Sequence, residues 1–221
     1  MNVAIIMAGG IGKRMNAEKP KQFLPLRGKP VILHSLETFQ KCPMIDAIAV
    51  VCAEGYIGVC KKLTEENNIT KCVSVVPGGA ERYDSSRIGV AEASKIADGT
   101  DAVVLIHDAA RPFVTEEIIA ANITAAEKFG ACETAIEMTD TVISGKDGFT
   151  EKVVPRESLY RVQTPQSFRL SVIREAFDSY DPETDGPVTD DATLVLRRGG
   201  RVAIVKGSAA NVKITTPEDL R

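Results

Sequence analysis

A glycine-rich segment near the start of the chain has the residue types that bind a polyphosphate. It reads Ala8-Gly-Gly-Ile-Gly-Lys-Arg-Met15 and directly follows the apolar run 3–7. Glycines let phosphate oxygens approach backbone N–H groups, and nearby cations supply the opposite charge. Lys13 and Arg14 lie in the segment itself, and Lys21 follows in a stretch whose prolines restrict the backbone. The pattern favours a phosphate site, although a solvated loop is the alternative.

Two familiar glycine-rich loops do not fit this segment. A P-loop requires glycine where Met7 stands, and serine or threonine where Arg14 stands. A dinucleotide-binding loop requires a small residue where Met15 stands. A nicotinamide-dependent oxidoreductase is therefore only a remote alternative. A nucleotide-binding module without chemistry is another, but it would not require cations at both 14 and 21.

A second candidate is the sequence His107-Asp108-Ala-Ala-Arg111-Pro112, which ends the apolar run 102–106. Ligands of parallel α/β sheets lie beyond the carboxyl ends of the strands, so Asp108 and Arg111 should lie on the same edge as the glycine loop. The Asp108 carboxylate suits Mg²⁺ or a sugar hydroxyl. His107 at a strand end is expected to be packed and hydrogen-bonded rather than a general base, and His34 to be structural.

The elements that position these residues alternate in type along the chain. Short connections between them predict an α/β fold with a doubly wound, mostly parallel sheet, covered on both faces. Strands are expected over residues 3–7, 47–52, 73–76, 102–106, 201–205 and 212–215, and helices over 30–39, 58–66, 84–96, 115–128, 171–180, 190–197 and from 216 onward.

Residues 137–161 break this alternation and read as an inserted β-hairpin arm with a turn at Gly145–Gly148. We treat 1–221 as a single domain that carries this arm. A two-stranded hairpin is too small to be stable alone in water, and the helices already cover the sheet. A partner subunit is therefore the expected support, which predicts a symmetric homodimer joined through the arm.

Composition excludes several classes of protein. The 27 basic and 30 acidic residues give a net charge of -3, unlike proteins that bind nucleic acid by bulk charge. We expect no membrane association, because no apolar run approaches the length of a membrane span, and no secretory signal. Five cysteines without a C-x-x-C, and two histidines, make a disulfide framework or a zinc site improbable. Reduced thiols in a cytoplasmic protein are expected.

Nine short motifs along the chain together resemble one family. They are MAGGIGKRM, KPKQF, PGGAERYDS, HDAARP, TDT, PRESLY, QTPQSF, TDDA and NVKITTPEDL. The chain resembles the cytidylyltransferases that activate polyol phosphates, a family with a Rossmann-like nucleotidyltransferase fold. The resemblance implies transfer of CMP from CTP to a polyol phosphate, with release of pyrophosphate and with Mg²⁺ or another divalent cation as cofactor.

The resemblance also implies roles for individual residues. Arg14 and Lys21 match the pair that stabilises the transition state at the α-phosphate of CTP. Arg156 and Lys213, which by themselves look like surface charges, match the pair that positions the acceptor phosphate. Thr141 matches an acceptor contact supplied by the partner subunit. The residues that match CTP contacts are Ala8, Gly9, Gly10, Gly12, Gly78, Gly79, Ser85, Asp108 and Arg111, with Asp108 also a candidate metal ligand.

Two branches of the family fit the chain. Gly9 and Ser144 differ from residues common in the 2-C-methyl-D-erythritol 4-phosphate branch and favour the ribitol 5-phosphate branch, as do the segments PKQFLPL and TAIEMTDTVI. The HDAARP and TDDA motifs favour the erythritol branch. We therefore expect the acceptor to be 2-C-methyl-D-erythritol 4-phosphate, an isoprenoid precursor of the methylerythritol phosphate pathway. Ribitol 5-phosphate, which would give CDP-ribitol for cell-wall polymers, is the alternative. In the region that matches cytosine recognition, Ala80 replaces an acidic residue that is common in some members.

Overall fold

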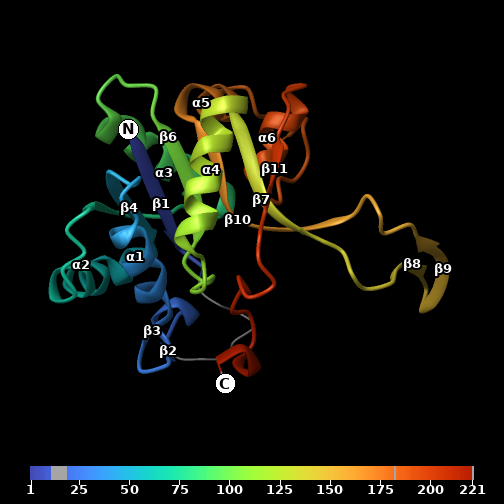
Figure 1. Ribbon diagram of the computed structural model, residues 1–221, viewed down its shortest axis with the longest axis horizontal. Helices are drawn as coiled ribbons and strands as arrows, with labels where there is room; N and C mark the ends of the chain where they lie inside the picture. Colours follow the sequence, from blue (N-terminus) through green and yellow to red (C-terminus); the bar gives the residue numbers. More distant parts are fainter. Residues whose placement is uncertain (11–18, 182, 221) are drawn as a thin grey trace.

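A twisted sheet forms the centre of the computed structural model, which describes residues 1–10, 19–181 and 183–220 (Figure 1). In this part of the chain the sheet has seven strands in the order β11-β7-β10-β6-β1-β4-β5. Only β10 runs antiparallel to its neighbours, so the mostly parallel sheet is confirmed. The strands are β1 (Asn2–Ala8), β4 (Ala47–Cys52), β5 (Cys72–Pro77), β6 (Val103–Asp108), β7 (Ala131–Glu137), β10 (Tyr160–Arg169) and β11 (Ala203–Lys206).

Helices cover both faces of the sheet, as the sequence predicts. Successive strand residues point to opposite faces, so Ile6 packs with one group of helices and Ile5 with the other. The first group is α1 (Val31–Lys41), α2 (Ile57–Glu66) and α4 (Glu116–Phe129), and the second is α3 (Arg82–Ala97), α5 (Leu170–Asp178) and α6 (Ala192–Arg197). Gly89 lets α3 approach closely, because a Cβ there would lie 2.5 Å from the side chain of Ile5.

Local sequence signals set two of these helix starts. The hydroxyl of Thr115 accepts a hydrogen bond from the backbone N–H of Ile118, which confirms the predicted start of α4. Helix α3 begins at Arg82, two residues before the expected 84, because Glu81 and Asp84 form a capping box. This earlier start places Arg82 at the first position of α3, beside the carboxyl edge of the sheet.

Between β1 and α1 the chain forms three short elements, η2 (Lys21–Phe23), β2 (Pro25–Leu26) and β3 (Lys29–Pro30). A further short turn, η3 (Glu54–Tyr56), leads into α2. These pieces lie near the end of β1 from which the glycine loop leaves (Figure 1). They hold Lys21 close to the sheet edge instead of leaving it on a free loop.

Three features differ from the expectation. Strands β7 and β10 were not predicted as such. Neither shows a clear alternation of apolar and polar residues, and β10 contains Pro165. The expected strand 212–215 is wrong. That segment runs extended beside the sheet edge, and its Ile214 N–H bonds to the carbonyl oxygen of Ala110. The expected final helix is a single 3₁₀ turn, η4 (Pro217–Leu220).

The predicted hairpin arm is present. Strands β8 (Val142–Lys146) and β9 (Phe149–Val154) pair in antiparallel register around a turn at Asp147 and Gly148, both of which have positive φ. The arm extends away from the sheet between β7 and β10 (Figure 1). Phe149 is 79% exposed, so the hairpin leaves a large apolar side chain in solvent.

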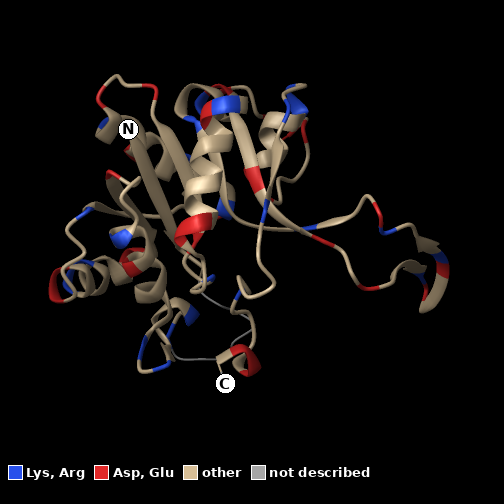
Figure 2. Ribbon diagram, viewed as in Figure 1, with Lys and Arg blue, Asp and Glu red and all other residues tan. Residues whose placement is uncertain are grey.

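Charges of both signs are interspersed over the described elements and along the arm (Figure 2). All five cysteines are free, as expected. Among the helices that the structure describes, none combines the length and the apolar composition that crossing a membrane requires.

Candidate active site

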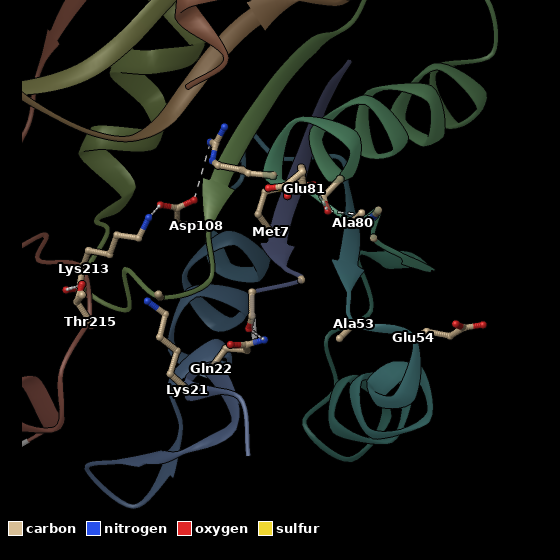
Figure 3. Close-up of a pocket in the computed structure, with 17 residues that line it drawn as sticks. Met7, Lys21, Gln22, Ala53, Glu54, Ala80, Glu81, Asp108, Lys213 and Thr215 are labelled. Atoms are coloured by element: carbon tan, nitrogen blue, oxygen red, sulfur yellow. Dashed lines mark hydrogen bonds and ion pairs between the residues drawn. The ribbon is translucent and has the colours of Figure 1, made fainter. Parts of the chain in front are cut away.

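A pocket of about 620 Å³ opens at the carboxyl ends of the parallel strands (Figure 3). This is the edge at which the sequence places the glycine loop and Asp108. The pocket is lined by Met7, Gly9, Gly10, Lys21, Gln22, Ala53, Glu54, Gly78, Gly79, Ala80, Glu81, Arg82, Ser85, Asp108, Ala110, Lys213 and Thr215. Segments from the two ends of the chain therefore meet in one cavity.

The structure brings together most of the residues implied by the resemblance. Gly9, Gly10, Lys21, Gly78, Gly79, Ser85, Asp108 and Lys213 all line the pocket. Ala8 is the buried last residue of β1, and its carbonyl oxygen accepts a hydrogen bond from the Gln22 amide. Gly12 and Arg14 lie outside the described residues, as does Lys13.

Asp108 is the buried carboxylate at the centre of the site. Its Oδ2 lies 2.7 Å from Lys213 Nζ, and its Oδ1 lies 4.0 Å from Arg82 Nη2. Burial alone would raise the pKa of Asp108, but the two cations outweigh it and hold this pKa below its ordinary value. The carboxylate is therefore charged, and Lys213, which looked like a surface residue in the sequence, lies directly beside it (Figure 3).

Arg82 carries a second ion pair, to Asp191 at 2.8 Å. Burial would lower the pKa of Arg82, whereas Asp191 and Asp108 raise it above its ordinary value. Neither member of this pair stands out in the sequence as a candidate site residue. Both lie inside motifs used for the resemblance, PGGAERYDS and TDDA. A basic residue at a helix start after two glycines was the signal that could have identified Arg82.

The Gly78–Gly79 turn forms the wall of the pocket beside α3. A Cβ at Gly79 would lie 2.2 Å from the Asp84 side chain, and one at Gly78 would lie 2.8 Å from Ser85 Oγ. Only glycine fits so close to the helix. The Ser85 hydroxyl accepts a hydrogen bond from the Gly79 N–H and donates one to the Glu81 carbonyl, each at 3.1 Å. This wall is thus preformed.

Lys21 and Gln22 come from the short turn η2 on the opposite side. Lys21 Nζ donates a hydrogen bond of 2.7 Å to the Ile214 carbonyl, next to Lys213. The buried Gln22 amide donates to the carbonyls of Ala8 and Gly10, at 2.5 and 3.1 Å. Gln22 therefore fixes the entrance of the glycine loop relative to Lys21. This glutamine lies in the KPKQF motif, but its residue type alone does not indicate the role.

Arg111 does not line the pocket. Its guanidinium donates hydrogen bonds to the carbonyl of Asn211 at 2.9 Å and to that of Val162 at 3.3 Å. Arg111 thus connects the end of β6 to β10 and to the segment that carries Lys213. Because Asn211 is two residues before Lys213 in the sequence, this contact indicates that Arg111 supports the segment that holds Lys213.

His107 is fully buried, as expected for a structural histidine. Its Nε2 lies 3.1 Å from the Arg111 carbonyl oxygen, and its Nδ1 lies 3.1 Å from Thr164 Oγ1. Burial lowers the pKa of His107 to about 4. With both ring nitrogens occupied, His107 has no free nitrogen with which to accept a proton from substrate.

This depressed pKa predicts an acid-dependent loss of stability. The unfolded chain takes up a proton at His107 below pH 6.5, while the folded chain does so only near pH 4. The contribution of neutral His107 to the free energy of unfolding is complete above pH 6.5. It is lost as pH falls toward 4, by up to about 3 kcal/mol. Urea unfolding from pH 7 to 4.5 should show a weaker pH dependence in His107→Gln than in the unsubstituted protein. His34→Gln is the control. An equal pH dependence in all three proteins would contradict the prediction.

Thr141 and Arg156 belong to the arm and do not line the pocket of their own chain. Both are exposed, and Arg156 Nη1 donates a hydrogen bond to the Thr139 carbonyl across the base of the arm. The arm extends away from the body of the molecule (Figure 1). Within the described chain, the residues to which the resemblance gives an acceptor role are therefore divided between the pocket and the arm.

The family model described as IspD, 2-C-methyl-D-erythritol 4-phosphate cytidylyltransferase, matches residues 2–221. The chain belongs to this family. Curated relatives of that name from Clostridium kluyveri and Clostridium acetobutylicum are 42% and 41% identical. The alignments cover 99% and 100% of this chain and 93% and 94% of the relatives.

Solved structures agree with this assignment. The 4-diphosphocytidyl-2C-methyl-D-erythritol synthase of Anaerococcus prevotii has a TM-score of 0.83 and 30% identity, over 99% of this chain and 92% of the other. The 2-C-methyl-D-erythritol 4-phosphate cytidylyltransferase of Thermus thermophilus has a TM-score of 0.78 and 30% identity, over 98% and 94%. The chain thus has the Rossmann-like nucleotidyltransferase fold and is a cytidylyltransferase, and nothing favours the oxidoreductase alternative.

Proposed function

We propose that this chain transfers CMP from CTP to 2-C-methyl-D-erythritol 4-phosphate and releases pyrophosphate. The observation that carries the proposal is the convergence of Lys21, Lys213 and Asp108 with the Gly9–Gly10 loop in one pocket. The relatives that share the whole chain are named for this acceptor. The same names favour it over ribitol 5-phosphate.

The chemistry requires cations rather than a general base. An oxygen of the acceptor phosphate attacks the α-phosphorus of CTP in line, and the bond to the pyrophosphate oxygen breaks. The acceptor phosphate is already deprotonated near pH 7, so no side chain has to remove a proton. The buried and doubly hydrogen-bonded His107 fits a mechanism without a base. Both reactants are anions, so charge neutralisation and alignment dominate.

We assign the two sides of the pocket to the two substrates. Lys21, together with Arg14, acts on the α-phosphate, while Lys213 and Arg156 hold the acceptor phosphate. The preformed wall at Gly78, Gly79 and Ser85 and the loop at Ala8, Gly9, Gly10 and Gly12 take CTP, with Asp108 near its ribose. Arg111 supports Lys213 indirectly, through the Asn211 carbonyl.

A divalent cation fits this site only in company with the nucleotide. The described residues include no group of three or more His, Cys, Asp or Glu side chains that could hold a metal ion. Mg²⁺ in phosphoryl-transfer sites usually binds one or two carboxylates and the substrate phosphates, and Asp108 provides such a carboxylate. When bound, Mg²⁺ would neutralise the phosphates of CTP.

We further propose that the arm completes the pocket of a second copy. The exposed apolar side chains of the hairpin, Ile143, Phe149 and Val153, favour burial against another protein surface. A symmetric dimer would place Thr141 and Arg156 of each arm at the acceptor side of the other pocket. This arrangement would account for the position of two acceptor residues away from their own pocket.

Pyrophosphate release measured with CTP, Mg²⁺ and a panel of polyol phosphates tests the proposed function. The panel contains 2-C-methyl-D-erythritol 4-phosphate, ribitol 5-phosphate and D-erythritol 4-phosphate. We expect the methylated acceptor to give the highest kcat/KM, and CTP alone to give none above background. Faster turnover of ribitol 5-phosphate would reassign the acceptor. Failure of every acceptor, in protein that binds CTP, would favour a binding module without chemistry.

A further inference from the structure

Four charges of alternating sign form a continuous row beside the pocket. Lys213 pairs with Oδ2 of Asp108 at 2.7 Å, Arg82 faces Oδ1 of Asp108 at 4.0 Å, and Arg82 pairs with Asp191 at 2.8 Å. Each oxygen of the Asp108 carboxylate thus faces one cation. The family resemblance accounts for Lys213 and Asp108, but it gives no role to Arg82 or Asp191.

The Asp191 end of this row is rigidly built. Its side chain is buried, with 1% of the residue exposed, and its backbone N–H donates a 2.9 Å hydrogen bond to Gln166 Oε1. Arg82 is the first residue of α3, and Asp191 directly precedes α6. The ion pair therefore joins two helices on the same face of the sheet, and it directs the Arg82 guanidinium toward the buried end of β6. A buried carboxylate such as Asp191 holds its cation firmly, because losing the partner is costly.

Lys213 and Arg82 differ in what they are free to do. In the proposed function Lys213 moves to the acceptor phosphate, which takes away the nearer counterion of Asp108. If no other cation stayed beside Asp108, its buried charge would be left uncompensated, and that cost would oppose the movement of Lys213. Arg82 is held by Asp191 from the opposite side, so it remains beside Asp108 when Lys213 leaves.

We propose that Arg82 and Asp191 are positioning residues that hold the Asp108 carboxylate in place while Lys213 turns to the acceptor phosphate. This inference rests on the proposed function. Arg82 acts through Asp108, and Asp191 acts through Arg82. The pair is thus required for acceptor turnover and much less for the binding of CTP alone, during which Lys213 still neutralises Asp108.

The double variant Arg82→Gln with Asp191→Asn removes both charges together, so that neither is left buried alone. Thermal unfolding, the Kd for CTP with Mg²⁺ in the absence of acceptor, and steady-state kinetics are measured for this variant. We expect a melting temperature close to that of the unsubstituted protein and a CTP Kd within about threefold. We expect kcat/KM for the acceptor to fall at least about tenfold. Arg82→Lys should retain much of the turnover, and Arg87→Gln, an exposed arginine on the same helix, should be unchanged.

Several outcomes would overturn the inference. If the double variant keeps normal acceptor kinetics, the pair is only a structural ion pair. If it loses CTP binding and acceptor turnover to the same extent, the pair supports the whole pocket instead of the acceptor step. If it does not fold, Asp191→Asn alone carries the test, because asparagine keeps the size of the side chain but removes the charge that holds Arg82; unchanged acceptor kinetics there would also overturn the inference. An unsubstituted protein without turnover on any acceptor would instead refute the proposed function.

Discussion

Replacing Lys21 by alanine is expected to lower kcat about a hundredfold while the KM for CTP changes only a few-fold. Lys21 lines the pocket beside the glycine loop, where negative charge develops only as the α-phosphorus is attacked. A cation that acts mainly on the transition state contributes about 3 kcal/mol, which corresponds to this loss of rate. Steady-state pyrophosphate release at varied CTP concentrations measures both constants.

The control for this prediction lies two residues away. Lys19→Ala removes an exposed lysine that does not line the pocket, and it should leave both constants unchanged. Lys21 also donates a hydrogen bond to the Ile214 carbonyl, so Lys21→Ala removes a donor as well as a charge. Lys21→Gln retains a donor without the charge and should lose most of the activity too. Near-normal kcat with weaker CTP binding would contradict the transition-state role.

Arg14→Ala is expected to behave like Lys21→Ala. This expectation rests on the family resemblance, because Arg14 lies outside the described residues. The double variant should be little slower than either single variant if the two cations act as a unit on the same phosphate.

Mixing Lys21→Ala subunits with Arg156→Ala subunits is expected to restore activity that neither variant has alone. If each pocket uses its own Lys21 and the partner's arm, a mixed dimer contains one intact pocket and one with both lesions. Random exchange makes about half the dimers mixed, so the mixture should recover about a quarter of the unsubstituted activity. Pyrophosphate release is measured before and after subunit exchange.

A matched mixture provides the control for the arm experiment. Arg156→Ala and Thr141→Ala both alter the arm, so every pocket formed from these two variants carries one lesion and no activity should be restored. If the first mixture also fails to recover, or if the protein sediments as a monomer, each pocket is complete within one chain. That result would refute the proposed role of the arm.

The sequence predicted the parts of the fold that follow from regular patterning. Apolar runs ending in glycine or in a charged residue located β1, β4, β5 and β6, and the strand-end rule then placed Gly9 and Asp108 on one edge. The hairpin was predictable because Asp147-Gly148 is a strong turn signal. These inferences need only local sequence and the geometry of parallel sheets.

What could not be predicted depends on contacts between distant segments. Lys213 reaches the site because its segment runs extended along the sheet edge, with the Ile214 N–H bonded to Ala110 rather than to a strand. The pairing of Arg82 with Asp191 joins residues that are 109 positions apart. Neither contact leaves a periodic signal, so only motif resemblance, or the structure itself, draws attention to them.

The most direct test of cytidylyl transfer follows the oxygens of the acceptor phosphate. We would incubate the protein with CTP, Mg²⁺ and 2-C-methyl-D-erythritol 4-phosphate labelled with ¹⁸O in its phosphate, and analyse the products by mass spectrometry. If the acceptor phosphate attacks the α-phosphorus, all the label appears in the CDP-linked methylerythritol and none in pyrophosphate. Label in pyrophosphate, or release of CMP without a CDP-linked product, would contradict the account.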